Sequence, residues 1–216
     1  MSGAVVIGAG PGIGQAVARR FAAEGLPIAV IARRDQTVAA AADAVAQTGV
    51  PVVALTADCT DDTALRAALD VAADSLGPPD VVVYNAALIR ADSPGTLSVA
   101  AHLHAWSINV IGALTAAAHV APGMAQRRRG TFIITGGMPE PDPRYVSLSL
   151  GKAGVRTLVT LLDKEYGPSG VHVATVTVTG AVAPDTAFDP KDIAEHYWQL
   201  HTQPRCHWQR EVIHSG

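Results

Sequence analysis

The glycine-rich stretch near the N-terminus carries the clearest chemical signal in this sequence. It follows the apolar run 4–7, which predicts a buried strand, and it precedes apolar residues at helical spacing. Because glycine lacks a β-carbon, a ligand can approach the backbone, and the free N–H groups at a helix start favour a dianion. Tight turns also use glycine, but a strand before it and a helix after it predict a pyrophosphate cradle. The residues expected to form this cradle are Gly8, Gly10, Gly12, Ile13 and Gly14.

Two arginines and an aspartate follow the next two predicted strands. In a dinucleotide-binding fold, an acidic residue at the tip of the second strand favours NAD, whereas an arginine favours the 2′-phosphate of NADP. Here the tip is Arg33-Arg34, with no acid before the first arginine. A pair of surface cations is the alternative interpretation, but we expect NADP(H) rather than NAD(H). Asp58 ends the third strand, where it would either cap a turn or bond the adenine amino group.

Polar residues later in the chain complete the set of candidates. Asn85 and Ala86 end the fourth strand, where small side chains would let a flat ring pass close by. Asn109 lies in an apolar helix and needs a hydrogen-bond partner, because a buried amide left unpaired is costly. Lys152 lies on a later helix and brings an amine to the same end of the fold.

The elements that position these residues alternate between short apolar strands and helices. Strands are expected at 4–7, 27–32, 51–57, 80–87, 131–135 and 171–178, with a possible last strand at 211–213. Helices are expected after the glycine stretch, at 36–47, up to Leu76, at 98–128, from Asp142-Pro143 to about Tyr166 and at 192–201.

This alternation predicts an α/β fold, a doubly wound parallel sheet of the Rossmann type that binds ligands at the carboxyl ends of its strands. The length fits a single domain covering residues 1–216. Pro122-Gly123 is expected to kink or break the longest helix. A short substrate lid is expected near 184–203.

Composition and charge narrow the function classes. With 49% apolar residues and 16% charged residues, the chain is that of a compact globular protein. A net charge of −3 gives no electrostatic case for nucleic acid or a membrane surface. Cys59 and Cys206 have neither the number nor the spacing of a metal site, so no metal is expected. Because the first strand is predicted so near the N-terminus, no signal peptide is expected. We also expect no apolar stretch long enough to span a bilayer. Together these expectations predict a cytoplasmic protein.

Several of these pieces, in this order, resemble the short-chain dehydrogenase/reductase family over essentially the whole chain. The matching pieces are Gly8-x-x-x-Gly12-x-Gly14, Asp58, Asn85-Ala86-Ala87, Asn109 and Lys152. The resemblance implies hydride transfer between a nicotinamide and a carbonyl or alcohol of a small molecule, with the lysine also holding the nicotinamide ribose. It further implies a homodimer or homotetramer built on the long helix and the Lys152 helix. Thr179-Gly180 stands in place of the family's Pro-Gly, and Thr186 is a possible counterpart of its later threonine.

The catalytic half departs from the family pattern. A tyrosine four residues before the lysine gives the proton in the family, because an ammonium on the same helix face lowers the pKa of the phenol. Leu148 occupies that position, and Gly137 stands where the family has a serine. Tyr145 lies seven residues before Lys152, roughly 10 Å along a helix, and Thr135 has the same strand parity as Gly137. We therefore consider Lys152, Asn109, Thr135 and Tyr145 as candidate catalytic residues.

Three interpretations follow from this pattern. The first is an NADP(H)-binding oxidoreductase with an atypical proton donor. The second is a nucleotide-binding protein without turnover, such as a redox sensor or a partner subunit. The third is a non-redox enzyme, for example a cyclase or lyase, that uses the same pocket.

The arginines at 33 and 34 generate a prediction about cofactor choice. NADPH should bind at least about tenfold more tightly than NADH, a difference of about 1.4 kcal/mol. The Arg33→Ala variant should lose most of this difference, because only NADPH carries the 2′-phosphate. Calorimetric titration of both cofactors measures it, and equal affinities in the wild type would rule out the arginine argument.

Overall fold

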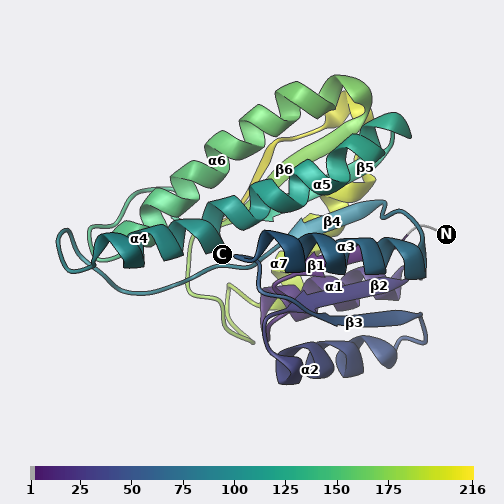
Figure 1. The fold of residues 1–216 in the computed structure, drawn as a ribbon, viewed down its shortest axis with the longest axis horizontal. Coiled ribbons are helices and arrows are strands. Elements are labelled where there is room, and N and C mark those ends of the chain that lie inside the picture. The colour runs from purple at the N-terminus through teal and green to yellow at the C-terminus, as the bar shows by residue number, and fades with distance from the viewer. Residues whose placement is uncertain (1–2) are drawn as a thin grey trace.

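The computed structural model describes residues 3–216, and within them seven parallel strands form one sheet (Figure 1). The strand order is β3-β2-β1-β4-β5-β6-β7, so the chain starts in the middle and is wound outward in both directions. The strands are β1 (Ala4–Ile7), β2 (Ile28–Ala32), β3 (Val52–Thr56), β4 (Val81–Tyr84), β5 (Gly130–Thr135), β6 (Val171–Val178) and β7 (Glu211–His214). This confirms the doubly wound parallel sheet and places a crevice where β1 and β4 lead away from each other.

Helices cover both faces of the sheet, which is why its central strands are continuous apolar runs. The helices are α1 (Ile13–Ala23), α2 (Asp35–Ala46), α3 (Asp62–Leu76), α4 (Val99–Trp106), α5 (Gly112–Gln126), α6 (Val146–Tyr166) and α7 (Pro190–Thr202). Short turns of other helix types are η1 (Ser107–Ile111), η2 (Gly167–Ser169) and η3 (Arg205–His207). One apolar layer joins the sheet to α3, α5 and α6, and the other joins it to α1, α2 and α7.

The expected long helix exists, but its irregularity lies in a different place. It runs from Val99 to Gln126 through the π turn η1, where the N–H of Gly112 bonds to the carbonyl of Ser107. Of the kink or break expected at Pro122-Gly123, the break is wrong, since α5 continues past Pro122, and the kink stays a prediction. Proline removes one N–H from the helix, and the buried neighbours Ala121 and Met124 keep this turn packed on the core.

The same helical run, Val99–Gln126, corrects the expectation that no apolar stretch is long enough to span a bilayer. Val99–Gln126 is long and apolar enough to cross a bilayer, although no stretch was expected to be. Within the protein, 56% of its most apolar window is buried. Packing against the sheet and α6 therefore accounts for its composition, as expected for the core helix of a globular protein.

Helix α6 begins later than the Asp142-Pro143 pattern indicates. Pro143 and Arg144 form a turn closed by the N–H of Tyr145 on the carbonyl of Asp142, at 2.9 Å. The Asp142 carboxylate accepts the Arg144 N–H at 2.8 Å, so it caps this turn and not the helix. The helix is capped from outside, because both carboxylate oxygens of buried Asp92 accept the N–H of Ser147 at 3.1 to 3.2 Å.

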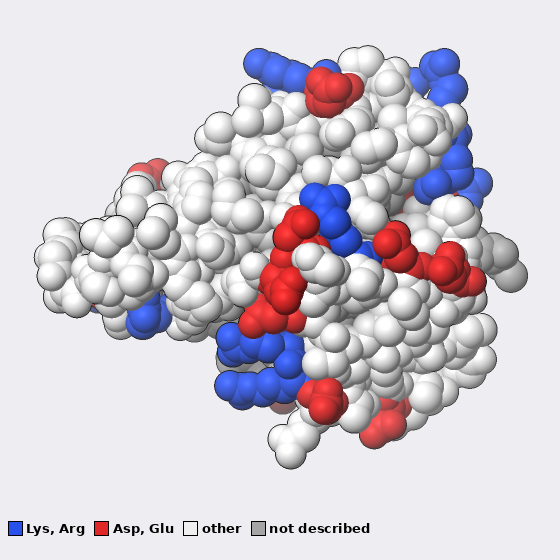
Figure 2. Space-filling view, in the orientation of Figure 1, with Lys and Arg blue, Asp and Glu red and all other residues white. Residues whose placement is uncertain are grey.

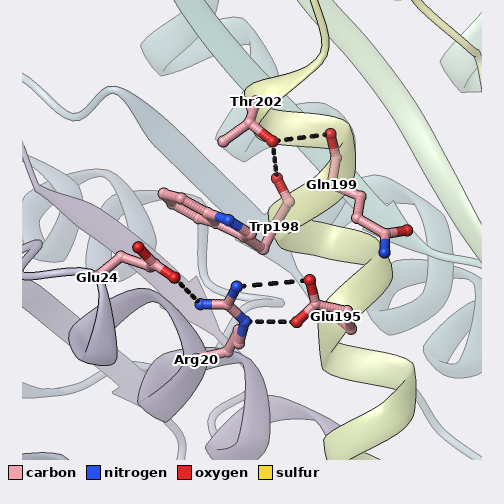
Figure 3. Close-up of polar contacts among 6 residues, drawn as sticks. All are labelled: Arg20, Glu24, Glu195, Trp198, Gln199 and Thr202. Atoms are coloured by element: carbon pink, nitrogen blue, oxygen red, sulfur yellow. Dashed lines mark hydrogen bonds and ion pairs between the residues drawn. The ribbon is translucent and has the colours of Figure 1, made fainter.

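Helix α7 is fastened to α1, as Figure 3 shows. Arg20 donates hydrogen bonds to Glu24, the residue that follows α1, and to Glu195 on α7, with 2.6 Å between its Nε and Glu195 Oε2. The guanidinium also lies over the ring of Trp198, 5.0 Å from its centre. Most of the expected lid at 184–203 is therefore a packed helix. Only the loop before α7 is left for such a role, which remains a prediction.

The Asp92 cap generates a prediction about stability. Replacing Asp92 with Ala should cost about 1–2 kcal/mol of unfolding free energy, because the first turn of α6 loses its acceptor. Burial raises the pKa of Asp92, but hydrogen bonds from Ser147 lower it by more. The stabilisation should be present above the unfolded pKa of about 3.9 and be lost as the pH falls further. Urea unfolding of wild type and variant at several pH values measures this.

The matched control is Asp61→Ala, which removes the exposed cap of α3 on the N–H of Ala64. It should cost less, since the acceptor it removes is replaced by water. Equal stability of Asp92→Ala and wild type near neutral pH would show that the contact contributes nothing.

Candidate cofactor and active site

A cleft of about 1670 Å³ runs along the carboxyl ends of the strands. It extends from the tips of β2 and β3 at one end to the loop after β6 at the other. Most of the residues expected to bind a cofactor line it: Gly8, Gly10, Gly12, Ile13, Arg33, Arg34, Asp58, Asn85, Ala86, Lys152 and Gly180. The sheet topology thus brings residues from most of the chain to one edge, as the sequence pattern predicts.

The glycine turn has the features of a pyrophosphate cradle. A β-carbon built on Gly10 or Gly12 meets no atom of the described residues within 4 Å, so the backbone there is open to a ligand. Gly12 has a φ of +103°, a conformation that side chains disfavour. Helix α1 starts immediately after it with no acidic residue in its first turn. The positive end of the helix dipole is therefore available to an anion.

Gly14 serves packing and not the cradle surface. A β-carbon on it would lie 2.3 Å from the carbonyl oxygen of Gly8, so α1 can lie close to the sheet only with glycine there. Gly8 is equally confined, because a β-carbon would meet the backbone of Ala86 at 2.4 Å. These contacts fit the separate roles that such glycines have in dinucleotide-binding turns.

The end of the cleft at β2 and β3 presents cations and one carboxylate. Arg33 and Arg34 are exposed at the tip of β2 and line the cleft. Asp58 accepts hydrogen bonds from the N–H and hydroxyl of Thr60 at 2.9 and 2.8 Å. Burial raises the pKa of Asp58, but these bonds and the nearby Arg33 lower it by more. This end of the cleft therefore holds a carboxylate close to the Arg33 guanidinium.

A line of hydrogen bonds supports the cleft floor. The Thr135 hydroxyl donates to Asn85 Oδ1 at 2.8 Å, and Asn85 Nδ2 donates to the carbonyl of Gly8 at 2.8 Å. The Tyr197 hydroxyl lies 2.7 Å from that of Thr135. Since the Thr135 proton is committed to Asn85, the Tyr197 hydroxyl is the donor in this pair. Side chains from α7, from β5 and from the segment after β4 thus hold Gly8, the first residue of the glycine turn.

Lys152 brings a buried amine to the other half of the cleft. Its side chain runs from α6 to the end of β5, where Nζ donates to the carbonyl of Thr135 at 2.6 Å. The residue is only 5% exposed, and within residues 3–216 no carboxylate forms an ion pair with it. Burial lowers the pKa of Lys152 to about 8. This amine can therefore gain or lose a proton near neutral pH.

The fold and this cleft match known proteins. A family model described as short chain dehydrogenase matches residues 2–192. The chain belongs to the short-chain dehydrogenase family.

Relatives and solved structures agree with this assignment. An uncharacterized oxidoreductase from Staphylococcus aureus (strain N315) is 28% identical over 213 residues, which cover 94% of this chain and 91% of the relative. The crystal structure of a metagenomic short-chain oxidoreductase in complex with NADP has a TM-score of 0.90 at 25% identity, covering 98% of this chain and 95% of that one. An alcohol dehydrogenase from the archaeon Thermococcus sibiricus, complexed with 5-hydroxy-NADP, has a TM-score of 0.88 at 24% identity and covers 99% and 95% of the two chains.

Compared with the pattern of its family, this short-chain dehydrogenase has an altered wall around Lys152. Leu148, four residues earlier on α6, lines the cleft and is only 6% exposed. Gly137 lies opposite, and a β-carbon built on it would be 3.6 Å from Lys152 Cε and 3.5 Å from the carbonyl oxygen of Val178. These are ordinary contact distances, so a serine side chain would have room, although the φ of +159° at Gly137 is one that side chains rarely adopt. The wall is therefore apolar where the family pattern has two hydroxyls.

Two candidate catalytic residues act as supports in the structure. Thr135 and Gly137 face different helices, since the Thr135 hydroxyl meets Tyr197 of α7 and a β-carbon on Gly137 would meet Lys152 of α6. Strand alternation does not relate them, because β5 ends at Thr135. The Thr135 hydroxyl is engaged with Asn85 and Tyr197, while Lys152 approaches from the α6 side and bonds only to its backbone oxygen. Asn109 is 1% exposed, and its Oδ1 accepts the N–H of Leu88 at 2.8 Å. It thus finds the expected partner and fixes the loop after β4 from behind the cleft.

Tyr145 remains a candidate in the open part of the cleft. It precedes α6 as the N-cap residue, is partly exposed and lines the cleft together with Leu148 and Lys152. Because the helix starts only at Val146, Tyr145 is not held in the regular helical position from which a seven-residue spacing is counted. Its part in proton transfer stays a prediction.

Arg156 is a functional neighbour that the sequence analysis missed. Its guanidinium donates to the carbonyl oxygens of Gly137 and Met138 at 3.1 and 3.2 Å and so holds the loop after β5. The available signal was its spacing of four residues from Lys152 on the same helix, which places both on one face. Thr186, in contrast, bonds within its own loop to the Ala183 carbonyl and does not line the cleft.

The glycine turn generates a prediction with a built-in control. Gly12→Val should still fold, since the added atoms enter open space, although the positive φ costs about 1–3 kcal/mol. It should no longer bind NADPH, because its side chain would occupy the cradle. Gly14→Val should instead lower the thermal midpoint strongly, because its β-carbon meets the Gly8 carbonyl. Calorimetric titration and thermal unfolding separate the two effects, and normal NADPH binding by Gly12→Val would show that the turn is not the cradle.

Proposed function

We propose that this protein is an NADP(H)-dependent oxidoreductase that acts on a carbonyl or alcohol of a small molecule with an atypical proton donor. The observation that carries the proposal is the buried Lys152 amine at one end of a cleft whose other end holds Arg33 and Asp58. The NADP in the complex of the metagenomic relative supports the choice of cofactor. The bound cofactor would supply or accept the hydride.

The residues of this chain fit such a cofactor in three places. Arg33 and Arg34 would pair with the 2′-phosphate, and Asp58 would accept from the adenine amino group. The open backbone at Gly10 to Ile13 would hold the pyrophosphate. At the other end, Lys152 would donate to the nicotinamide ribose, and Gly180 would lie on the wall of the cleft beside it.

Lys152 is central to the proposed proton transfer. A carbonyl oxygen that accepts a hydride must also gain a proton, and Leu148 has none to give. Water or the substrate itself would deliver the proton, with the Lys152 ammonium organising the relay and Asn109 holding the Leu88 backbone nearby. Because the pKa of Lys152 is about 8, reduction should slow as the pH rises through that value.

A second candidate function rests on the same wall. Leu148 and Gly137 together leave no hydroxyl at the two positions where the family pattern has them. A nucleotide-binding protein without turnover, such as a redox sensor or a partner subunit, would need only the cofactor part of the cleft. The two functions differ in turnover but not in NADPH binding.

We also propose that the protein forms a homodimer or homotetramer through the end of the molecule that carries α4 and the start of α6. This end extends beyond the sheet in Figure 1 and shows few charged side chains in Figure 2. Val99 and Leu103 on α4 and Leu150 on α6 are 76%, 62% and 55% exposed. Contiguous exposed apolar surface of this kind favours association. A cytoplasmic location stays part of this proposal.

The altered wall generates a prediction about activity. The wild type should reduce generic ketones and aldehydes poorly, because general acid catalysis contributes about 10²–10⁴-fold and a donor to the carbonyl oxygen about 10²–10³-fold. The paired replacement Leu148→Tyr with Gly137→Ser should raise NADPH-dependent reduction of an activated ketone. It restores both hydroxyls beside Lys152, and absorbance of NADPH measures the rate.

The control for this experiment is Leu148→Phe with Gly137→Ser, which adds the aromatic ring without the hydroxyl group. Brisk reduction by the wild type would contradict the prediction and make Tyr145→Phe the next variant to measure. No gain in the double variant, with NADPH still bound tightly, would favour the second candidate function.

A further inference from the structure

The loop between β6 and α7, residues 179–189, forms one wall of the cleft near Lys152. Thr179, Gly180, Ala181, Val182 and Pro184 line the cleft from this loop. The second half of the loop closes on itself, since the N–H of Ala183 bonds to the carbonyl of Phe188 at 3.3 Å. Residues 183–189 thus hold one another through hydrogen bonds, and contacts from outside the loop place them against the rest of the protein.

Those contacts come from the end of the chain. His214, the last residue of β7, accepts the N–H of Thr179 on its carbonyl at 3.1 Å. Its ring nitrogen Nε2 lies 2.9 Å from the carbonyl oxygen of Ala187. The ring also meets Phe188 edge to face, with 5.6 Å between ring centres. One residue thus touches the loop at its beginning and near its end.

Phe188 lies between His214 and the backbone that lines the cleft. Its ring lies so close to Gly180 that a β-carbon there would be 2.3 Å from Phe188 Cε2. Gly180 faces the cleft on one side and this ring on the other. A movement of the Phe188 ring would therefore move the backbone of the wall.

A second histidine, His196, contacts the ring of His214, and the bond to Ala187 determines which nitrogen of that ring carries the proton. A carbonyl can only accept, so His214 Nε2 must carry a proton to bond Ala187. In the neutral ring, Nδ1 is then an acceptor, and it lies 3.0 Å from His196 Nε2 on α7, which must be the donor. Burial and the neighbouring His214 lower the pKa of His196. The line of donors runs from α7 through β7 to the loop.

We propose that His214 is a positioning residue for the nicotinamide half of the cofactor site, acting through Ala187 and Phe188 on the wall at 179–184. This inference rests on the proposed function for the identity of the ligand. It adds the role of the C-terminal strand, which lies outside the cleft and is remote in sequence from the glycine turn. His196, held on α7 beside it, orients the His214 ring.

The first test needs no cofactor. Hydrogen exchange of the protein without ligand should be faster at the amides of 183–188 in His214→Phe than in the wild type, because the ring remains but its bond to Ala187 is lost. His214→Gln keeps an amide donor for Ala187 and should restore the slower exchange. The matched control is His207→Phe, which replaces an exposed histidine that has no hydrogen bond or ring contact to this loop within residues 3–216. Unchanged exchange in His214→Phe would overturn the inference.

The second test compares a whole and a half ligand. His214→Phe should weaken NADPH binding by about five- to tenfold, the size of effect expected from one lost hydrogen bond. Adenosine 2′,5′-bisphosphate carries only the adenine half, so its affinity should stay within about twofold of the wild type. The fluorescence emission of bound NADPH should fall in His214→Phe. His214→Gln should recover most of the NADPH affinity and of this emission. Fluorescence titration and calorimetry measure these affinities.

Each outcome bears on one of the two proposals. Equal weakening of both ligands in His214→Phe would show a general loss of structure and overturn the positioning role. Failure of the wild type to bind NADPH would overturn the proposed function, while hydrogen exchange would still decide whether His214 holds the loop. If His214→Phe does not fold, His196→Phe removes the donor to His214 Nδ1, and it should weaken NADPH binding but not binding of the half ligand.

Discussion

The hydrogen bonds from Tyr197 through Thr135 and Asn85 to the Gly8 carbonyl are the constraint on which the cleft depends. They join α7, β5, β4 and the end of β1 beneath the glycine turn. Every member is buried or half-buried, so each donor left without an acceptor would cost free energy comparable to that of the bond itself. The turn can stay open to a ligand above because its position is determined from below.

The same principle operates along the whole carboxyl edge of the sheet. Where a strand ends, its last carbonyl groups have no partner strand and can accept from side chains. Lys152 bonds to the carbonyl of Thr135, the last residue of β5, and Arg156 bonds to those of Gly137 and Met138 in the loop that follows. Polar side chains near the cleft thus divide into those that face the ligand and those that fasten the backbone. Asn109 and Thr135 belong to the second group, although their residue types also suit the first.

The sequence predicts the sheet well because strands that are buried on both faces consist of short apolar runs. It also predicts the glycine turn, because glycines at this spacing between a strand and a helix are typical of few other structures. It predicts less where an element is completed by a distant partner. The cap of α6 comes from Asp92, more than fifty residues earlier in the chain, so the local pattern Asp142-Pro143 indicates a helix start that belongs to a turn. Thr135 illustrates a second limit, since strand alternation cannot be extended past the last residue of the strand.

The π turn η1 has a consequence for the whole rod of α4 and α5. One extra residue in a helical turn rotates everything that follows by about 100° about the axis. Before the turn, Val99 and Leu103 face outward; after it, Gly112 and Ala113 face the sheet, with Gly112 against the Tyr84 hydroxyl. The extra residue in η1 therefore changes the direction in which the apolar side chains of α5 face relative to those of α4. The same run of helix can in this way be buried in the core at one end and expose apolar side chains at the other.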